Sequence, residues 1–267
     1  MIYDSIMYFG EDDLLEIRME ELWDIVDKFV ITESTITFRG KPKETYFHEG
    51  RFEKYKDKMI YFLADLNASS DTLNAITYAP EIEYAQRDYF SKNLSFQDDD
   101  IFIISDMDEI PRAETLKAYG LQNLVRMYGM CKLIHSMHYY YVNYDSVARH
   151  RRWYGTVITS GKSIRECLPS SLRRKARSGT GKGIRNGGWH FSYLGGPEKI
   201  KEKIRGSAHV EYDKEEIYSL ENIARCMNTG DDMYNRGLKF EVNNKRELPK
   251  YLMENRDKFS HLFYRES

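Results

Sequence analysis

Three acidic side chains, Asp106, Asp108 and Glu109, follow directly on a short apolar run at residues 101–104. The run has the length of a strand buried on both faces and is too short for a helix. Pro111 ends the extended segment, and ligands of open α/β sheets bind just beyond the carboxyl ends of strands. Because side chains two residues apart in an extended segment lie on one side, Asp106 and Asp108 can point at one cation.

Carboxylate oxygens suit Mg2+ or Mn2+, and substrate phosphates commonly complete the coordination shell of these ions. The simplest interpretation is therefore a metal ion that bridges the protein and a nucleotide diphosphate. The alternative is an ordinary solvated loop, because the chain has 42 acidic residues and a second acidic run at 98–100. The position directly after a buried strand favours the metal site.

Two further candidates lie elsewhere in the sequence. His190 stands between aromatic residues in an expected strand at 189–193 and could be a third metal ligand, although such a histidine is more often a core residue. Arg87, on an expected helix, could reach a phosphate or form a surface ion pair. The run Tyr139-Tyr140-Tyr141 favours core packing, with sugar stacking as the alternative.

Alternating strand and helix patterns precede the acidic residues and predict an α/β fold with a mostly parallel sheet flanked by helices. The expected strands are at 2–9, 29–32, 59–63, 130–144, 157–159 and 189–193. The expected helices begin at residue 11 and at residue 80, and later ones cover 197–206, 215–227 and 248–262. Neither a repeat nor a linker divides the chain, so we expect a single domain.

Composition narrows the class of protein. The chain has 267 residues, of which 41% are hydrophobic and 31% charged, as in ordinary globular proteins. A net charge of −2 gives no field that would favour nucleic acid. No apolar run approaches the roughly 20 residues of a membrane span. The three cysteines are widely spaced and no signal peptide is evident, so we expect reduced thiols, no structural zinc and a cytoplasmic location.

A glycine-rich basic segment at 178–188 contains Lys182 and invites comparison with phosphate-binding loops. Neither Gly161-Lys162-Ser163 nor Gly181-Lys182-Gly183 matches the Gly-x4-Gly-Lys-Ser/Thr pattern, so a P-loop is excluded. The segment could still cradle an anion through backbone N–H groups. A mobile surface loop is an equally good interpretation.

Five segments together resemble glycosyltransferase family 17, the β-1,4-mannosyl-glycoprotein β-1,4-N-acetylglucosaminyltransferases. They cover residues 12–18, 29–34, 37–43, 105–111 and 188–192. The resemblance implies a GT-A-like fold, a UDP-sugar donor with UDP-GlcNAc as the first expectation, Mn2+ or Mg2+, a glycan acceptor and inversion at the anomeric carbon. It also implies a nucleotide-sugar-binding half at 1–111 and an acceptor-side half at 112–267.

On this hypothesis a cation polarises the departing diphosphate and a general base activates the acceptor hydroxyl. Glu109 is the nearest candidate base, with a supporting or helix-capping role as the alternative, and Asp231 or Asp232 are further candidates. The remaining roles are metal binding by Asp106, Asp108 and His190, nucleoside or donor binding by Glu33 and Asp106, and diphosphate binding by Arg87 and Lys182.

Two rival functions remain open at this point. A Mg2+-dependent phosphohydrolase of the haloacid type needs Asp-x-Asp-x-Thr, but Ile110 stands where the threonine belongs. A non-catalytic glycan-binding protein would keep the aromatic residues and bind no nucleotide. Binding of UDP in the presence of Mn2+ distinguishes the transferase from both rivals.

Overall fold

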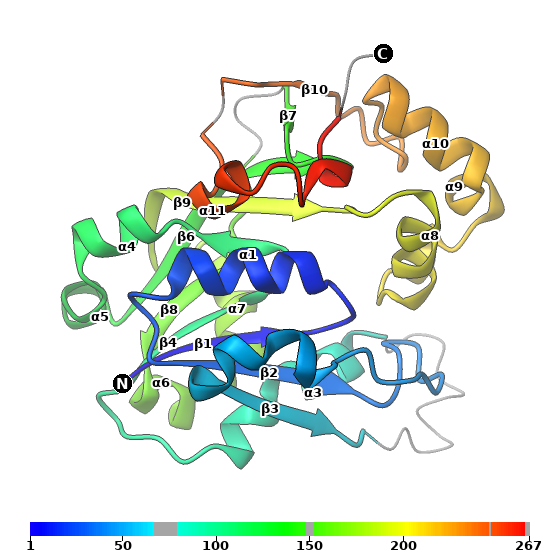
Figure 1. Ribbon diagram of the computed structural model, residues 1–267. Helices are drawn as coiled ribbons and strands as arrows, with labels where there is room; N and C mark the ends of the chain where they lie inside the picture. The colour runs from blue at the N-terminus through cyan, green and yellow to red at the C-terminus, as the bar shows by residue number, and fades with distance from the viewer. Residues whose placement is uncertain (67–78, 148–151, 246, 265–267) are drawn as a thin grey trace.

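The computed structural model describes residues 1–66, 79–147, 152–245 and 247–264, and one ten-stranded sheet runs through this part of the chain (Figure 1). The strands are β1 (Ile2–Met7), β2 (Lys28–Ser34), β3 (Met59–Ala64), β4 (Ile101–Asp106), β5 (Glu109–Pro111), β6 (Met130–Tyr139), β7 (Tyr144–Ser146), β8 (Val157–Ser160), β9 (Lys182–Ser192) and β10 (Phe240–Val242).

The longer helices are α1 (Asp12–Leu22), α3 (Ala79–Asn93), α4 (Ala113–Tyr119), α5 (Leu121–Tyr128), α6 (Gly161–Glu166), α7 (Pro169–Arg177), α8 (Pro197–Gly206), α9 (Glu215–Tyr218), α10 (Leu220–Thr229) and α11 (Lys250–Glu254). The 3-10 helices are η1 (Glu49–Lys58), η2 (Val210–Tyr212) and η3 (Ser260–Leu262).

The sheet is parallel in its first half and mixed in its second. Strands β3, β2, β1 and β4 lie side by side in this order and run in one direction. Strand β8 pairs antiparallel with β4 and with β6, whereas β6 and β9 are parallel. Strand β5 pairs antiparallel with β9, and β7 joins β6 to β10. The predicted α/β fold, with a largely parallel central sheet flanked by helices, is therefore confirmed.

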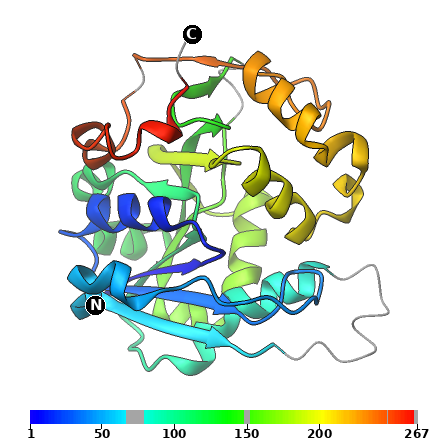
Figure 2. The ribbon, with the colours of Figure 1, turned by 45° about the vertical axis from the view of Figure 1, so that its right-hand side comes forward.

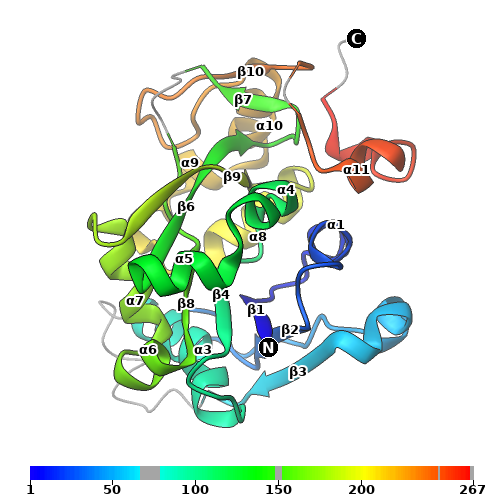
Figure 3. The ribbon, with the colours of Figure 1, turned by 90° about the vertical axis from the view of Figure 1, so that its left-hand side faces the viewer.

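Strand β4 is buried on both faces, as its apolar run predicts. Ile101 and Ile103 belong to the core that α1 and α5 cover, whereas Phe102 and Ile104 belong to the core that α3 and α7 cover. Figure 3 shows α1 and α11 on one side of the sheet and α6 and α7 on the other. Because packing from both sides fixes β4, the acidic turn at its end has a rigid base.

A separate core holds α8 and α10 against the ends of β6 and β10. Ile200 and Ile204 of α8 share this core with Tyr139, Tyr140 and Phe240. The rings of Tyr139 and Phe240 stack with centroids 4.5 Å apart. Tyr139 and Tyr140 are therefore core residues, as the packing interpretation predicts. In Figure 2 helices α8, α9 and α10 form a layer on the side toward which β1, β2 and β3 point.

The glycine-rich segment differs from its prediction. It is a loop only as far as Gly181, because β9 begins at Lys182 and pairs with β6. Its glycines permit close backbone packing: a Cβ atom on Gly188 would lie 2.0 Å from the carbonyl oxygen of Ile110, and one on Gly187 would lie 2.6 Å from Cβ of Leu133. Gly187 and Gly188 therefore serve the close packing of strands.

Two predicted helices are shorter than expected. The segment 215–227 forms two helices because Ser219 is extended between them, and its side chain caps α10 by accepting a hydrogen bond from the N–H of Asn222. The expected helix at 248–262 is reduced to α11 and η3. Within the described residues, we find no helix with the length and apolar character needed to span a membrane.

Candidate functional site

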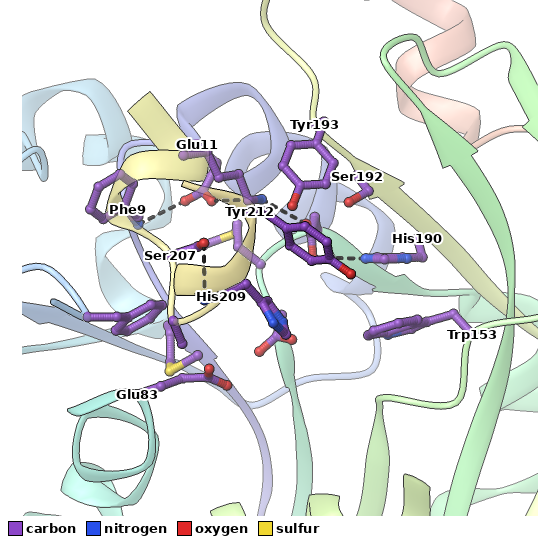
Figure 4. Close-up of a pocket in the computed structure, with 18 of the residues that line it drawn as sticks. Phe9, Glu11, Glu83, Trp153, His190, Ser192, Tyr193, Ser207, His209 and Tyr212 are labelled. Atoms are coloured by element: carbon purple, nitrogen blue, oxygen red, sulfur yellow. Dashed lines mark hydrogen bonds and ion pairs between the residues drawn. The ribbon is translucent and has the colours of Figure 1, made fainter. Parts of the chain in front are cut away.

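A pocket of about 320 Å³ lies beyond the carboxyl ends of β1 and β4 (Figure 4). Its floor includes Asp106, Met107 and Asp108 from the turn after β4, and its walls include His190 of β9 and Lys203 of α8. The first half of the chain thus contributes the strand ends and the second half contributes much of the wall. This is the position in which open α/β sheets bind ligands.

Asp106 lines the pocket with its side chain about 30% exposed, and each carboxylate oxygen has an arginine partner. Arg87 of α3 donates to Oδ1 at 2.6 Å, and Arg173 of α7 donates to Oδ2 at 2.6 Å. Arg87 also forms an ion pair with Glu83, another pocket residue. Arg87 therefore forms an ion pair, the alternative to the predicted phosphate contact, but it is buried and does not itself line the pocket.

Asp108 also lines the pocket but is almost completely buried. The ammonium group of Lys203 donates to Oδ2 at 2.8 Å, and Nε2 of His190 lies 3.5 Å from Oδ1. Burial by itself would raise the pKa of Asp108, but Lys203 and His190 together hold it well below its usual range. Asp108 is therefore a carboxylate anion at neutral pH.

Glu109 does not line the pocket, which argues against its predicted role as general base. It is fully buried, and Arg173 donates to both of its oxygens, at 2.7 and 2.8 Å. Trp153 and Thr156 donate to it as well. Burial would raise its pKa, but Arg173 holds it far below the usual value. A Cβ atom on Gly155 would lie 1.9 Å from Oε1, so a glycine is required beside this carboxylate.

Arg18 of α1 supports the acidic turn from below and is fully buried. It forms a bidentate ion pair with Asp4 of β1, with nitrogen–oxygen distances of 2.6 and 2.7 Å. Its Nη1 also donates to the backbone carbonyl groups of Asp106 and Glu109, at 3.2 and 2.6 Å, and its Nη2 donates to the hydroxyl of Ser105. One side chain therefore fixes both ends of the turn that presents Asp106 and Asp108.

His190 lies in the pocket wall, stacked on Trp153 with ring centroids 4.4 Å apart. Its Nδ1 is buried and has no hydrogen-bond partner. In the sheet, His190 is paired with Glu109, so β9 brings it to the acidic turn. The structure thus places all three predicted metal ligands, Asp106, Asp108 and His190, on one pocket. No group of three His, Cys, Asp or Glu side chains within the described residues is already arranged to hold a metal ion.

The ion pairs around the acidic turn form two groups, each with an excess of negative charge. Glu83, Asp106 and Glu109 share Arg87 and Arg173, whereas Glu11 and Asp108 share Lys203. With every member ionised, the two groups together have a net charge of −2. A divalent cation would neutralise this charge, so the electrostatics and the oxygen-rich donor set both fit Mn2+ or Mg2+.

Three other predicted residues lie outside the pocket wall. The carboxylate of Glu33 is buried and accepts hydrogen bonds from Lys43, Tyr61 and the backbone of the segment after residue 44, so it holds that segment against β2. Lys182 is exposed at the start of β9, eight residues or roughly 26 Å of strand from His190. Asp232 is buried, with its oxygens bound by Arg236.

Several pocket residues were not predicted. Lys203 has no local signal, because a lysine on an amphipathic helix is usually solvated. Trp153 and Arg177 were also not predicted, although aromatic and arginine side chains are common in ligand-binding sites. The guanidinium group of Arg177 lies 4.8 Å from the Trp153 ring centroid. Glu11 lines the pocket near Lys203, and burial raises its pKa. These residues can be recognised as pocket residues only in the folded structure, where distant segments of the chain come together.

These features describe an α/β protein with an acidic pocket at the carboxyl ends of parallel strands. The chain belongs to glycosyltransferase family 17, whose sequence model matches residues 1–265. It is 26% identical over 310 residues to a Rattus norvegicus protein named β-1,4-mannosyl-glycoprotein 4-β-N-acetylglucosaminyltransferase, and 25% identical over 303 residues to the Homo sapiens protein of that name. The alignments cover 99% and 98% of this chain but 55% and 54% of these relatives, so the chain spans about half their length.

Solved structures with looser similarity include Staphylococcus aureus TarS (residues 1–349), with a TM-score of 0.43 and 12% identity over 85% of this chain and 70% of that one. Another is 4-diphosphocytidyl-2C-methyl-D-erythritol synthase, with a TM-score of 0.42 and 10% identity over 70% of this chain and 87% of that one.

Proposed function

We propose that this chain is an inverting glycosyltransferase that moves a sugar, with GlcNAc as the first candidate, from a UDP-sugar to a glycan acceptor. The observation that carries this proposal is the presence of both Asp106 and Asp108 in the floor of one pocket, beyond the carboxyl end of β4. Membership of family 17 and the names of the relatives support the type of reaction. On this proposal residues 1–111 supply most of the nucleotide-sugar site, to which His190 and Lys203 are added, and residues 112–267 form most of the acceptor side.

Asp106, Asp108 and His190 would hold the Mn2+ or Mg2+ ion. The charge of +2 on this ion would balance the net charge of −2 of the ion-paired side chains around the acidic turn. When bound, such an ion acts as a Lewis acid toward the oxygens of a departing diphosphate. Lys203, which lines the pocket and contacts Asp108, brings positive charge to the diphosphate position, whereas Arg87 is buried beside Asp106 and holds that carboxylate in place. The Trp153 ring stacks on His190 and would hold that imidazole in position beside Asp108.

Glu11 replaces Glu109 and Asp232 as our candidate for the general base. It lines the pocket, whereas Glu109 and Asp232 do not. Burial raises its pKa, which makes its carboxylate a stronger base than an exposed glutamate. Glu11 is held by a hydrogen bond of 2.8 Å from the N–H of Phe9 and lies 3.6 Å from Lys203.

Metal-dependent hydrolysis and transfer from a panel of UDP-, GDP- and CMP-sugars tests the function. We expect Mn2+-dependent activity with UDP-GlcNAc and a β-mannose-terminated oligosaccharide as acceptor, and loss of activity in EDTA that added Mn2+ restores. Release of phosphate from sugar phosphates without use of any nucleotide sugar would favour the phosphohydrolase. Calorimetric binding of the oligosaccharide without binding of UDP and Mn2+ would favour the non-catalytic protein.

The contact between Lys203 and Asp108 also leads to a prediction about the affinity for the cation. Its ammonium group contacts Oδ2 of Asp108, so Lys203→Met removes a positive charge that would compete with a cation for this carboxylate. We expect the affinity for Mn2+ to rise about 10-fold, a factor equivalent to about 1.4 kcal/mol, because Lys203 is partly exposed and its charge is screened. Electron paramagnetic resonance of free Mn2+ measures the change.

Lys201→Met is the matched control, since Lys201 is on the same helix and lies 5.4 Å from the Tyr218 ring centroid, outside the pocket. It should leave the affinity for Mn2+ unchanged. An equal or lower affinity for Mn2+ in Lys203→Met would show that the ion does not use the Asp108 carboxylate.

A further inference from the structure

One end of the pocket is formed by three tyrosines and an arginine, named here the tyrosine platform: Tyr193, Tyr212, Tyr234 and Arg236. Tyr193 directly follows β9, Tyr212 ends η2, and the other two belong to the segment between α10 and β10. All four come from the second half of the chain. The platform is therefore built separately from the strand ends that carry Asp106 and Asp108.

Contacts within the platform fix its rings in place. The hydroxyl of Tyr234 donates to that of Tyr193 at 2.6 Å, and the Tyr212 and Tyr234 ring centroids are 4.1 Å apart. The guanidinium carbon of Arg236 lies 4.7 Å from the Tyr234 ring centroid. Tyr234 is thus a buried support, and Tyr212 is the more accessible ring. Figure 4 shows Tyr212 in the middle of the pocket, with its hydroxyl directed toward His190 and Trp153.

The positive charge of the platform is already balanced. Arg236 donates to Asp232 through Nε at 3.0 Å and through Nη2 at 2.9 Å, and Nη2 also contacts the hydroxyl of Tyr139 at 3.0 Å. A phosphate or carboxylate would therefore meet no uncompensated cation on Arg236. What the platform offers is aromatic surface with phenol hydroxyls at its margin, which suits a ligand with an apolar face and hydroxyl groups at its edge.

We propose that the tyrosine platform binds a neutral pyranose ring of the acceptor, stacked on Tyr212. This inference rests on the proposed glycosyltransferase function and names the part of the pocket that the acceptor occupies. A pyranose has a face of C–H groups and a rim of hydroxyls, so it matches both properties of the platform. The acidic turn and its basic partners remain for the diphosphate of the donor.

Steady-state transfer to a β-mannose-terminated oligosaccharide, measured beside donor hydrolysis without acceptor, tests the inference. Tyr212→Ala should raise KM for the oligosaccharide at least 10-fold and change donor hydrolysis less than 2-fold. Tyr212→Phe keeps the ring and should stay within about 3-fold of the parent KM. Tyr218→Ala is the matched control, because Tyr218 packs against the same core outside the pocket and should leave KM unchanged.

An unchanged acceptor KM in a folded Tyr212→Ala variant, or an equal rise in KM for donor and acceptor, would overturn the inference and leave the proposed function intact. If the parent chain neither hydrolyses nor transfers any donor sugar, the proposed function fails instead. Saturation-transfer NMR with the oligosaccharide alone still tests the platform in that case. It should show binding to the parent chain and not to Tyr212→Ala, and equal signals from both would reject the site.

Discussion

Replacing Asp108 with asparagine should reduce sugar transfer by at least about 1,000-fold, because the pocket would lose the buried carboxylate that we propose as a ligand of the cation. The substitution keeps the shape of the side chain but removes the charge whose pKa is held low beside Lys203 and His190. Lewis-acid stabilisation of a leaving group contributes several kcal/mol, and each 1.36 kcal/mol changes a rate about 10-fold. Transfer from UDP-GlcNAc at saturating Mn2+ measures the loss.

Asp98→Asn is the control for this substitution. Asp98 precedes β4 and forms a surface ion pair with Arg165, with about two-thirds of its side chain exposed. Its replacement should leave both transfer and stability close to those of the parent chain. Transfer by Asp108→Asn within 10-fold of the parent rate would contradict the assignment of Asp108 as a metal ligand.

Replacing Arg18 with methionine should lower the free energy of unfolding by about 3–5 kcal/mol, the usual effect of removing one member of a buried ion pair. The carboxylate of Asp4 would lose its bidentate partner, and both side chains are fully buried. The carbonyl groups of Asp106 and Glu109 would also lose their donor. Urea denaturation measures the stability, and transfer under conditions that keep the variant folded should fall more than 10-fold.

Arg51→Met is a matched control, because Arg51 also pairs with acids of α1, Asp12 and Asp13, but is 43% exposed. It should cost less than about 1 kcal/mol. The double variant Asp4→Asn with Arg18→Met should recover part of the lost stability, since no unpaired charge remains buried. Full activity in a folded Arg18→Met variant would show that the acidic turn holds its shape without this support.

The part of the fold that local pattern determines could be predicted from the sequence. The run at 101–104 was recognised as a buried strand because its apolar residues are continuous, and β4 has all four of them buried. Asp106 and Asp108 were recognised by their position after that strand, and His190 by its place in a later strand. The structure brings all three to one pocket.

The predicted roles that differ from the structure depended on proximity in sequence or on composition. Glu109 was chosen as a base because it follows Asp108, but the chain turns at Met107 and Asp108, and β5 then carries Glu109 into the interior. Lys182 was assigned to a loop because glycines surround it. Pairing with β6 overrides that local preference, as tertiary contacts often do.

The partners of the acidic turn could not be predicted because they are remote in the chain. Arg18 is 91 residues from Glu109, Arg173 is 67 residues from Asp106, and Lys203 is 95 residues from Asp108. A sequence pattern reports neighbours within a helix turn or a strand, and none of these pairs is local. Each partner also has an ordinary local setting on an amphipathic helix.

The same separations set the order in which the site can form during synthesis. A domain generally folds as a unit, so its parts must all have been synthesised before it is complete. Arg18 is available when the acidic turn leaves the ribosome, but Arg173 and Lys203 are still to be translated. An emerging chain that ends before α7 contains Asp106, Asp108 and Glu109 but lacks Arg173 and Lys203. Of the three basic side chains that form ion pairs with these acids, only Arg87 is then present. The charge pairing of this corner of the protein is therefore complete only after α7 and α8 have been translated.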